Sequence, residues 1–228
     1  MNRSPVLELR QVHKLYQGRT PLHVLRGVDL ALFPGELVGI IGVSGSGKST
    51  LLNIMGLLDP PTQGRLYIQG RDVTGLAGAD AAAVRRDLFG FVFQNSCLLA
   101  EFTLGENLII PIHLAGRRPT SDELARARRL LGDLGLGELA NRRPGEASAG
   151  ERQRAALARA LVGRPKVLLA DEPTGSLDEG NSHQLFSLLR GWVEEESIAA
   201  AVVTHDVELA RHYCHRLLSL SGGKLASG

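Results

Sequence analysis

A short glycine-rich segment, placed between an apolar strand pattern and a helical pattern, constrains this chain more than any other feature. Leu37 to Ile41 is continuously apolar, and Ser49 to Leu58 has a helical pattern that Asp59-Pro60-Pro61 should end. The segment between them fits GxxxxGK(S/T) and consists of Gly42, Val43, Ser44, Gly45, Ser46, Gly47, Lys48, Ser49 and Thr50. Strand, glycine loop and helix in this order predict a phosphate-binding loop in an α/β protein.

The residue types in this loop predict that it binds ATP together with Mg²⁺. Glycines let backbone amides turn toward phosphate oxygens at the N-terminus of a helix. Lys48 is expected to contact the β- and γ-phosphates, and the Ser49 hydroxyl is expected to ligate Mg²⁺. Kinases, GTPases and motor proteins share such a loop, so the loop alone leaves those classes open.

Two carboxylates follow a second apolar strand pattern. Val167 to Ala170 is apolar, and Asp171 and Glu172 come directly after it. We expect Asp171 to hold the magnesium shell, directly or through water, and Glu172 to polarise the attacking water. Adjacent carboxylates at a strand end are also common as solvated turn residues. The phosphate loop upstream favours the catalytic role, because phosphoryl transfer needs both a metal holder and a base.

The rest of the pattern predicts one α/β domain with two additions to its core. Alternating residues between Val6 and Leu32 predict an antiparallel layer, and helical patterns dominate from Cys97 to about Leu161. Within the latter we expect a helix over Ser121 to Leu134, capped by Ser121-Asp122-Glu123. Strand and helix alternate from Lys166 to Tyr213, which predicts a mostly parallel sheet.

Composition excludes several other classes of protein. The 228 residues carry a formal net charge of +2, without a clustered Lys/Arg excess, so nucleic acid is not expected as a partner. The two cysteines, Cys97 and Cys214, have no ligand spacing, which argues against a disulfide framework and a zinc site. Apolar runs fall short of the roughly 20 residues that span a bilayer. We therefore expect a soluble chain, or one that reaches a membrane only through a partner.

Several further motifs occur in a fixed order along the chain. After the phosphate loop come Phe93-Gln94, Ser148-Ala149-Gly150-Glu151-Arg152-Gln153-Arg154, Asp171-Glu172, Ser176-Leu177-Asp178 and Thr204-His205-Asp206. In this order they resemble the ATPase subunit of an ATP-binding cassette (ABC) transporter, over nearly the whole chain. The resemblance implies a phosphate-loop (RecA-like) core with an antiparallel β subdomain and an inserted α-helical subdomain at about 96–160. The resemblance places all of this in a single ABC ATPase domain of residues 1–228.

The resemblance also implies a head-to-tail homodimer. Each ATP would lie between the phosphate loop of one subunit and the signature segment of the other. Ser148 and Gly150 would face the γ-phosphate bound by the partner copy, and Asp178 would cross the dimer interface.

Three more residues receive roles from the resemblance. Gln94 would sense magnesium and water while contacting an integral membrane subunit, and His205 would hold the γ-phosphate and the attacking water. Tyr16 resembles in position the aromatic side chain that stacks on adenine, which is sensible because every purine offers a π-face. The alternatives are a surface glutamine, a structural histidine and a packed core tyrosine. The order of the motifs favours the functional roles.

The signature segment departs from the usual Leu-Ser-Gly-Gly-Gln/Glu at Ala147 and Ala149. A methyl group at Ala149 is expected to push a phosphate contact outward or to restrict φ, at about 1 kcal/mol if φ is positive there. We therefore predict slower ATP turnover than a consensus signature would give. The alternative is that this helix N-terminus accepts alanine readily.

Within the ABC family, Gly56-Leu57-Leu58-Asp59-Pro60-Pro61-Thr62 and Ala170-Asp171-Glu172-Pro173-Thr174-Gly175 resemble the lipoprotein-releasing (LolD-type) and MacB-type subgroup. That subgroup implies a peripheral ATPase on the cytoplasmic face of the inner membrane, which powers lipoprotein release or export through a membrane partner. One alternative is a cell-division (FtsE-type) ATPase without transport. Another is a soluble ABC protein acting on ribosomes or DNA, which would need paired cassettes or a long coiled coil.

Overall fold

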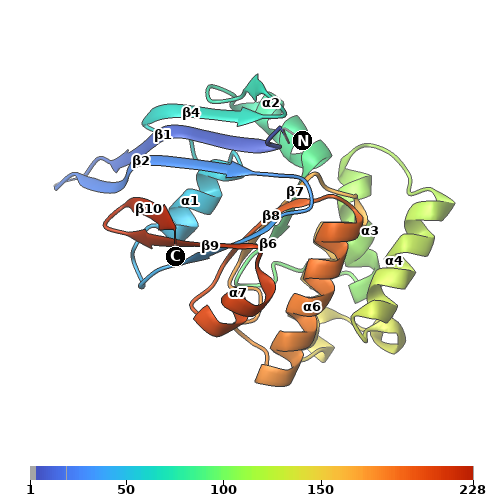
Figure 1. The fold of residues 1–228 in the computed structure, drawn as a ribbon. Helices are drawn as coiled ribbons and strands as arrows, with labels where there is room; N and C mark the ends of the chain where they lie inside the picture. The colour runs from blue at the N-terminus through green and yellow to red at the C-terminus, as the bar shows by residue number, and fades with distance from the viewer. Residues whose placement is uncertain (1–3, 19, 228) are drawn as a thin grey trace.

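A four-stranded antiparallel sheet forms one side of the structure, a computed structural model that describes residues 4–18 and 20–227. Strand β1 (Leu7–Tyr16) pairs with β2 (Leu22–Leu32) on one side and with β4 (Gln63–Ile68) on the other. The short β5 (Arg71–Asp72) lies beyond β4, which gives the order β2-β1-β4-β5. The antiparallel layer predicted from the N-terminal alternation is confirmed (Figure 1).

The second sheet has six strands in the order β10-β9-β3-β8-β7-β6. They are β3 (Leu37–Ile41), β6 (Phe89–Val92), β7 (Val167–Asp171), β8 (Ala199–Val203), β9 (Arg216–Ser221) and β10 (Lys224–Ser227). All neighbouring pairs are parallel except β9 with β10. Parallel strands end at a common edge, so β3, β8, β7 and β6 deliver the residues that follow them to one side of the sheet.

Successive side chains of the parallel strands enter two different cores, one on each face of this sheet. Leu169 packs in the core that helix α1 (Lys48–Met55) shares with the antiparallel sheet. Leu168 packs on the opposite face, with α5 (Ala149–Val162) and α6 (Glu179–Glu195). Burial on both faces explains why these strands are continuously apolar in the sequence.

Three helices lie between β6 and β7 in the chain: α3 (Leu104–Leu114), α4 (Ser121–Asp133) and α5, with two short 3₁₀ turns before α5. In Figure 1, α3 and α4 lie at the side of the molecule away from the antiparallel sheet. The remaining helices are α2 (Gly78–Leu88) and α7 (Val207–Tyr213). Within residues 4–18 and 20–227, no helix is both long and apolar enough to cross a bilayer.

Some boundaries differ from those predicted. The helix expected over Ser49 to Leu58 ends at Met55, because Leu57 takes a left-handed φ of 57°. Helix α4 is capped by Thr120 rather than by Ser121-Asp122-Glu123: the Thr120 hydroxyl accepts a hydrogen bond from the Glu123 amide at 3.2 Å. Helix α2 and the β9–β10 hairpin have no counterpart among the predicted elements. Only Ala81 of α2 is buried, so its sequence carries little apolar periodicity.

Candidate nucleotide-binding site

A cavity of about 640 Å³ lies at the edge where the parallel strands end. Most of its lining residues were assigned to the site from the sequence: Tyr16, Gly42, Ser44, Gly45, Gly47, Lys48, Ser49, Thr50, Gln94, Asp171, Glu172 and His205. The lining also contains three residues that were not assigned to it, Leu22, Val24 and Gly175. Ser46, Ser148, Gly150 and Asp178 lie outside the lining. The volume is in the range of small-molecule sites, roughly 300–1,000 Å³.

The phosphate loop adopts a conformation that leaves backbone amides free to bind an anion. Gly47 precedes α1 with φ of 103°, and a Cβ there would lie 2.8 Å from Val24 Cγ1, so only glycine fits. Among the described residues, no side chain caps the first turn of α1. The free amide groups of this turn and the positive end of the helix dipole therefore favour a phosphate.

Two polar groups of the loop fit a triphosphate. The Lys48 ammonium donates hydrogen bonds to the carbonyl oxygens of Gly42 (2.8 Å) and Val43 (3.1 Å), which hold it over the loop. The Ser46 hydroxyl oxygen is buried and has no hydrogen-bond partner within the described part of the chain. A buried hydroxyl without a partner is costly, and an additional acceptor such as a phosphate oxygen would relieve that cost.

The ends of β7 and β8 bring an acid and an imidazole together. Glu172 Oε2 lies 2.8 Å from Nδ1 of His205 and accepts a second hydrogen bond from the His205 amide at 3.3 Å. The Glu172 side chain is 14% exposed and that of His205 is 76% exposed. Glu172 has φ of 49°, and its amide donates to Val203 O at 2.9 Å. A non-glycine residue held at positive φ costs about 1–3 kcal/mol, and such strain concentrates at functional sites.

Three oxygen-bearing side chains face the same cavity from separate segments: Ser49 at the start of α1, Asp171 at the end of β7 and Gln94 after β6. Oxygen ligands of this type suit Mg²⁺, which typically takes one or two carboxylates and completes its shell with phosphate and water. In the described ranges, no group of three or more His, Cys, Asp and Glu side chains could hold a metal. The oxygen donors of Ser49, Asp171 and Gln94 fit a magnesium ion whose shell phosphate oxygens and water complete.

Helix α5 holds the segment that carries Gln94 from both ends. The Gln153 side chain, 2% exposed, donates to Phe93 O at 3.1 Å. The Arg159 guanidinium donates to Ser96 O at 2.9 Å and to Cys97 O at 2.6 Å. Burial lowers the pKa of Arg159. These contacts were not foreseen from the sequence, because they join residues about 60 positions apart.

Tyr16 lines the cavity and is 40% exposed. Its hydroxyl donates to Asp59 Oδ2 at 2.6 Å, and the Lys14 ammonium lies 4.9 Å from the ring centroid. Burial and then the hydrogen bond to Asp59 raise the pKa of Tyr16. The sequence analysis used Asp59 as part of a helix end and of the subgroup motif, without a role beside Tyr16, and gave Lys14 no role.

Ser148, in the signature segment, and Asp178 stand at the N-termini of α5 and α6, and neither lines the cavity. Ser148 caps α5, accepting from the Glu151 amide at 3.2 Å, and its own amide donates to the Glu151 carboxylate at 2.7 Å. The hydrogen bond from the Ser148 amide, and after it the Ser148 hydroxyl, lower the pKa of the Glu151 carboxyl. Asp178 caps α6 by accepting from the Asn181 amide at 2.9 Å, which lowers the pKa of Asp178.

Ala149 is the first residue of α5 and does not have a positive φ. The expectation that a methyl group strains the backbone here is therefore wrong, since an α-helical residue accepts alanine without cost. Ala147 is buried in the core beside α5, with 6% exposure. Only the outward projection of the Ala149 methyl remains as a reason for slower turnover.

Comparison with known proteins agrees with this geometry. The family described as "ABC transporter" matches residues 25–175. The lipoprotein-releasing system ATP-binding protein LolD 2 of Caulobacter vibrioides is 47% identical over 223 residues, covering 97% of both chains. The chain belongs to the ABC transporter family. It is an ATP-binding and ATP-hydrolysing subunit of an ABC transporter.

Two further ABC proteins are similar to this chain over most of its length. The macrolide export protein MacB of Marinobacter nauticus is 42% identical over 226 residues, which cover 99% of this chain but 35% of MacB. The solved post-hydrolysis dimer of the ATP-binding cassette MJ0796, bound to ADP and Pi, is 38% identical, with a TM-score of 0.89 over 97% of this chain and 98% of that one. These matches confirm the α/β ABC ATPase fold. They also favour the transport interpretation over the cell-division and soluble alternatives.

Proposed function

We propose that this ABC subunit uses Mg-ATP to drive lipoprotein release through an integral membrane partner, at the cytoplasmic face of the inner membrane. The observation that supports this most is the 47% identity to a protein named for the lipoprotein-releasing system. Macrolide-type export is the second candidate, supported by 42% identity to MacB. Both candidates use the same ATPase chemistry and differ in the cargo of the membrane partner.

The chemistry follows from the residues around the cavity. The loop amides and Lys48 hold the triphosphate, and Ser49, Asp171 and Gln94 supply the protein's part of the magnesium shell. Glu172 accepts a proton from the water that attacks the γ-phosphorus, so that ATP and water give ADP and phosphate. His205 orients Glu172 through the 2.8 Å contact and lies exposed, where it can reach the γ-phosphate. Tyr16 stacks on the adenine ring.

A second copy of the chain completes the site in head-to-tail orientation. Ser148 and Gly150 of one copy face the γ-phosphate held by the other, and Asp178 lies in the interface between them. Two features support this proposal: Ser148 and Asp178 are exposed caps of α5 and α6, and neither they nor the half-buried Gly150 line their own chain's cavity. The helical subdomain, at about 96–160, carries the signature on α5.

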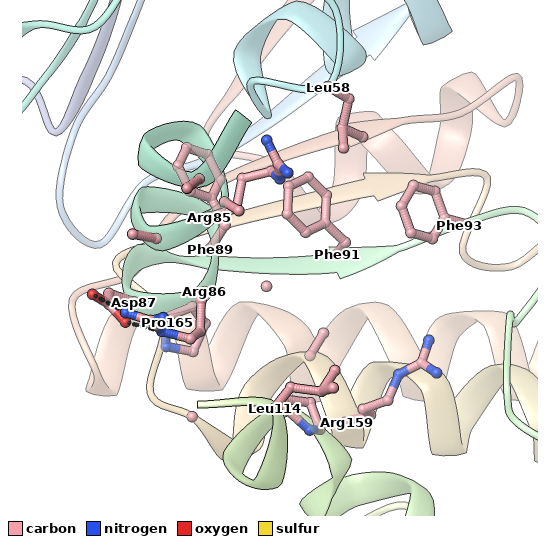
Figure 2. A pocket seen from close by; sticks show the side chains of 17 residues that line it. Leu58, Arg85, Arg86, Asp87, Phe89, Phe91, Phe93, Leu114, Arg159 and Pro165 are labelled. Atoms are coloured by element: carbon pink, nitrogen blue, oxygen red, sulfur yellow. Dashed lines mark hydrogen bonds and ion pairs between the residues drawn. The ribbon is translucent and has the colours of Figure 1, made fainter. Parts of the chain in front are cut away.

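An apolar groove beside the nucleotide site is the surface that we assign to the membrane partner. Phe89 and Phe91 of β6 and Phe93 just after it line one side of the groove, with Leu114 and Arg159 across from them (Figure 2). Leu114 is 77% exposed and lines this groove of about 640 Å³, so its apolar surface is open to a docking partner. Because Phe93 precedes Gln94, a helix docked here would sense closure of the nucleotide site and carry it to the membrane.

The test is co-purification with the membrane partner, followed by ATPase assays with acylated lipoprotein, the same lipoprotein without its acyl chains, and a macrolide. Stimulation by the acylated form alone supports lipoprotein release. Stimulation by the macrolide alone would replace it with the export function. Glu172→Gln serves as the control for hydrolysis by contaminating ATPases.

A further inference from the structure

Tyr16 belongs to a three-residue cluster with Asp59 and Lys14. Its hydroxyl donates to one oxygen of Asp59, Oδ2, at 2.6 Å. The other oxygen, Oδ1, accepts from the Lys14 ammonium at 2.5 Å. Lys14 also donates to Pro60 O at 2.7 Å. One carboxylate in the turn after α1 therefore joins two side chains of β1.

The cluster is anchored from the inside of the protein. Lys14 is 7% exposed and does not line the cavity, whereas Tyr16 does, so the ammonium approaches the ring from the protein side. A buried ammonium needs a counter-charge, and Asp59 supplies it with a side chain that is 25% exposed. The turn is tied to β1 a second time, because the Leu15 amide donates to the Thr62 hydroxyl at 3.0 Å.

We propose that Asp59 is a positioning residue that fixes the Tyr16 ring for stacking on the purine of the nucleotide, and that Lys14 fixes Asp59. The inference rests on the proposed function, in which Tyr16 contacts the base. A tyrosine at an exposed strand end would otherwise sample several rotamers, and binding would have to order it. The hydroxyl bond orders the ring beforehand, which strengthens binding without adding a contact to the ligand.

This arrangement separates recognition of the base from recognition of the phosphates. Asp59 lies outside the lining of the cavity that Lys48 and Ser49 help to form. Loss of the Asp59–Tyr16 bond should therefore weaken binding of ATP and leave binding of inorganic tripolyphosphate unchanged. In steady-state assays, KM for ATP should rise while kcat stays constant, since Glu172 and His205 are untouched.

Equilibrium titration of the full chain with ATP and with tripolyphosphate, each competing against a ribose-labelled fluorescent ATP, tests the proposal. The variants are Tyr16→Phe, Asp59→Asn and their double variant. We expect each single variant to raise the Kd of ATP by about three- to tenfold, the scale of ordering one side chain on binding. Because Asp59 acts through the phenol, the double variant should match the single ones. The control is Asp72→Asn, which removes a 2.7 Å ion pair with Arg65 on the same sheet and should change neither Kd.

Three outcomes would overturn the inference. One is an unchanged ATP Kd in Tyr16→Phe, a variant that retains the ring and the Lys14–Asp59 pair and so folds even if Asp59→Asn does not. Another is full additivity in the double variant, and the third is an equal loss of tripolyphosphate binding. Tyr16→Ala separates this failure from that of the proposed function: if it leaves the ATP Kd unchanged, Tyr16 does not contact the base at all, and both statements are wrong.

Discussion

The substitution Gly42→Ala tests how closely the phosphate loop is packed against the sheet. Gly42 follows β3, and a Cβ there would collide with the backbone oxygen of Leu220 on β9 and lie 2.8 Å from Ser46 Oγ. The Leu220 carbonyl is part of the sheet and cannot rotate away as a side chain would. The start of the loop must therefore move, by about 0.5–1 Å if normal contact distances are to be restored.

The expected losses of stability and of hydrolysis rate follow from this displacement. Overpacking of this kind costs about 1–3 kcal/mol, which lowers Tm by about 2–12 °C for a chain of this length. A reacting group misplaced by about 1 Å loses roughly 100-fold in rate. We therefore expect Gly42→Ala to lower kcat/KM for ATP by about 100-fold while the protein stays folded at assay temperature.

The assay compares ATP hydrolysis and thermal unfolding of Gly42→Ala with those of Gly191→Ala. Gly191 sits inside α6, and apart from its chain neighbours and the local helix backbone, no heavy atom of the described residues lies within 4 Å of a Cβ added there. The control should gain up to about 1 kcal/mol in stability and hydrolyse ATP like the parent, because alanine favours the helix. Hydrolysis by Gly42→Ala equal to that of the control would refute the close-packing argument.

Three further predictions concern other parts of the chain. Arg159→Met keeps the packing of the side chain but leaves two backbone carbonyls without donors, so urea unfolding should show a loss of about 1–3 kcal/mol. Ala149→Gly should raise kcat for ATP, because it removes an exposed methyl from the signature; equal kcat values would contradict this. The hydrogen bond from Arg117 is the main cause that lowers the pKa of Glu123 from 4.5 to about 2, so its stabilisation is present above 4.5 and lost toward 2. The Tm difference between the parent and Glu123→Gln should accordingly shrink as the pH falls through this window.

The sequence predicts the parts of the site that are local. The phosphate loop, the carboxylates after β7 and His205 after β8 are each recognisable from the apolar strand that precedes them. Parallel strand ends meet at one edge, so recognising the strands is enough to expect these groups to lie together. The structure places all of them around one cavity.

The contacts that the sequence does not predict depend on long-range register. Asp59 meets Tyr16 across 43 positions, and Arg159 meets Cys97 across 62. The residue spacings typical of helices and strands predict neither contact, because each joins a turn or loop to a regular element whose position is set by tertiary packing. The left-handed backbone of Glu172 is similar: nothing in a glutamate signals positive φ, which here accompanies its hydrogen bond to Val203 O.

In the proposed mechanism two copies of the chain share each ATP site, and mixing two inactive variants tests whether they do. Lys48→Ala removes the phosphate contact of one copy, and Ser148→Arg blocks the signature that its partner would use. Each variant alone should be inactive, whereas an equimolar mixture should recover hydrolysis, to at most about a quarter of the parent rate. That limit follows because about half of the dimers are mixed and each has one complete site. A mixture no more active than the two variants separately, with Ser148→Arg alone retaining the parent rate, would contradict the shared site.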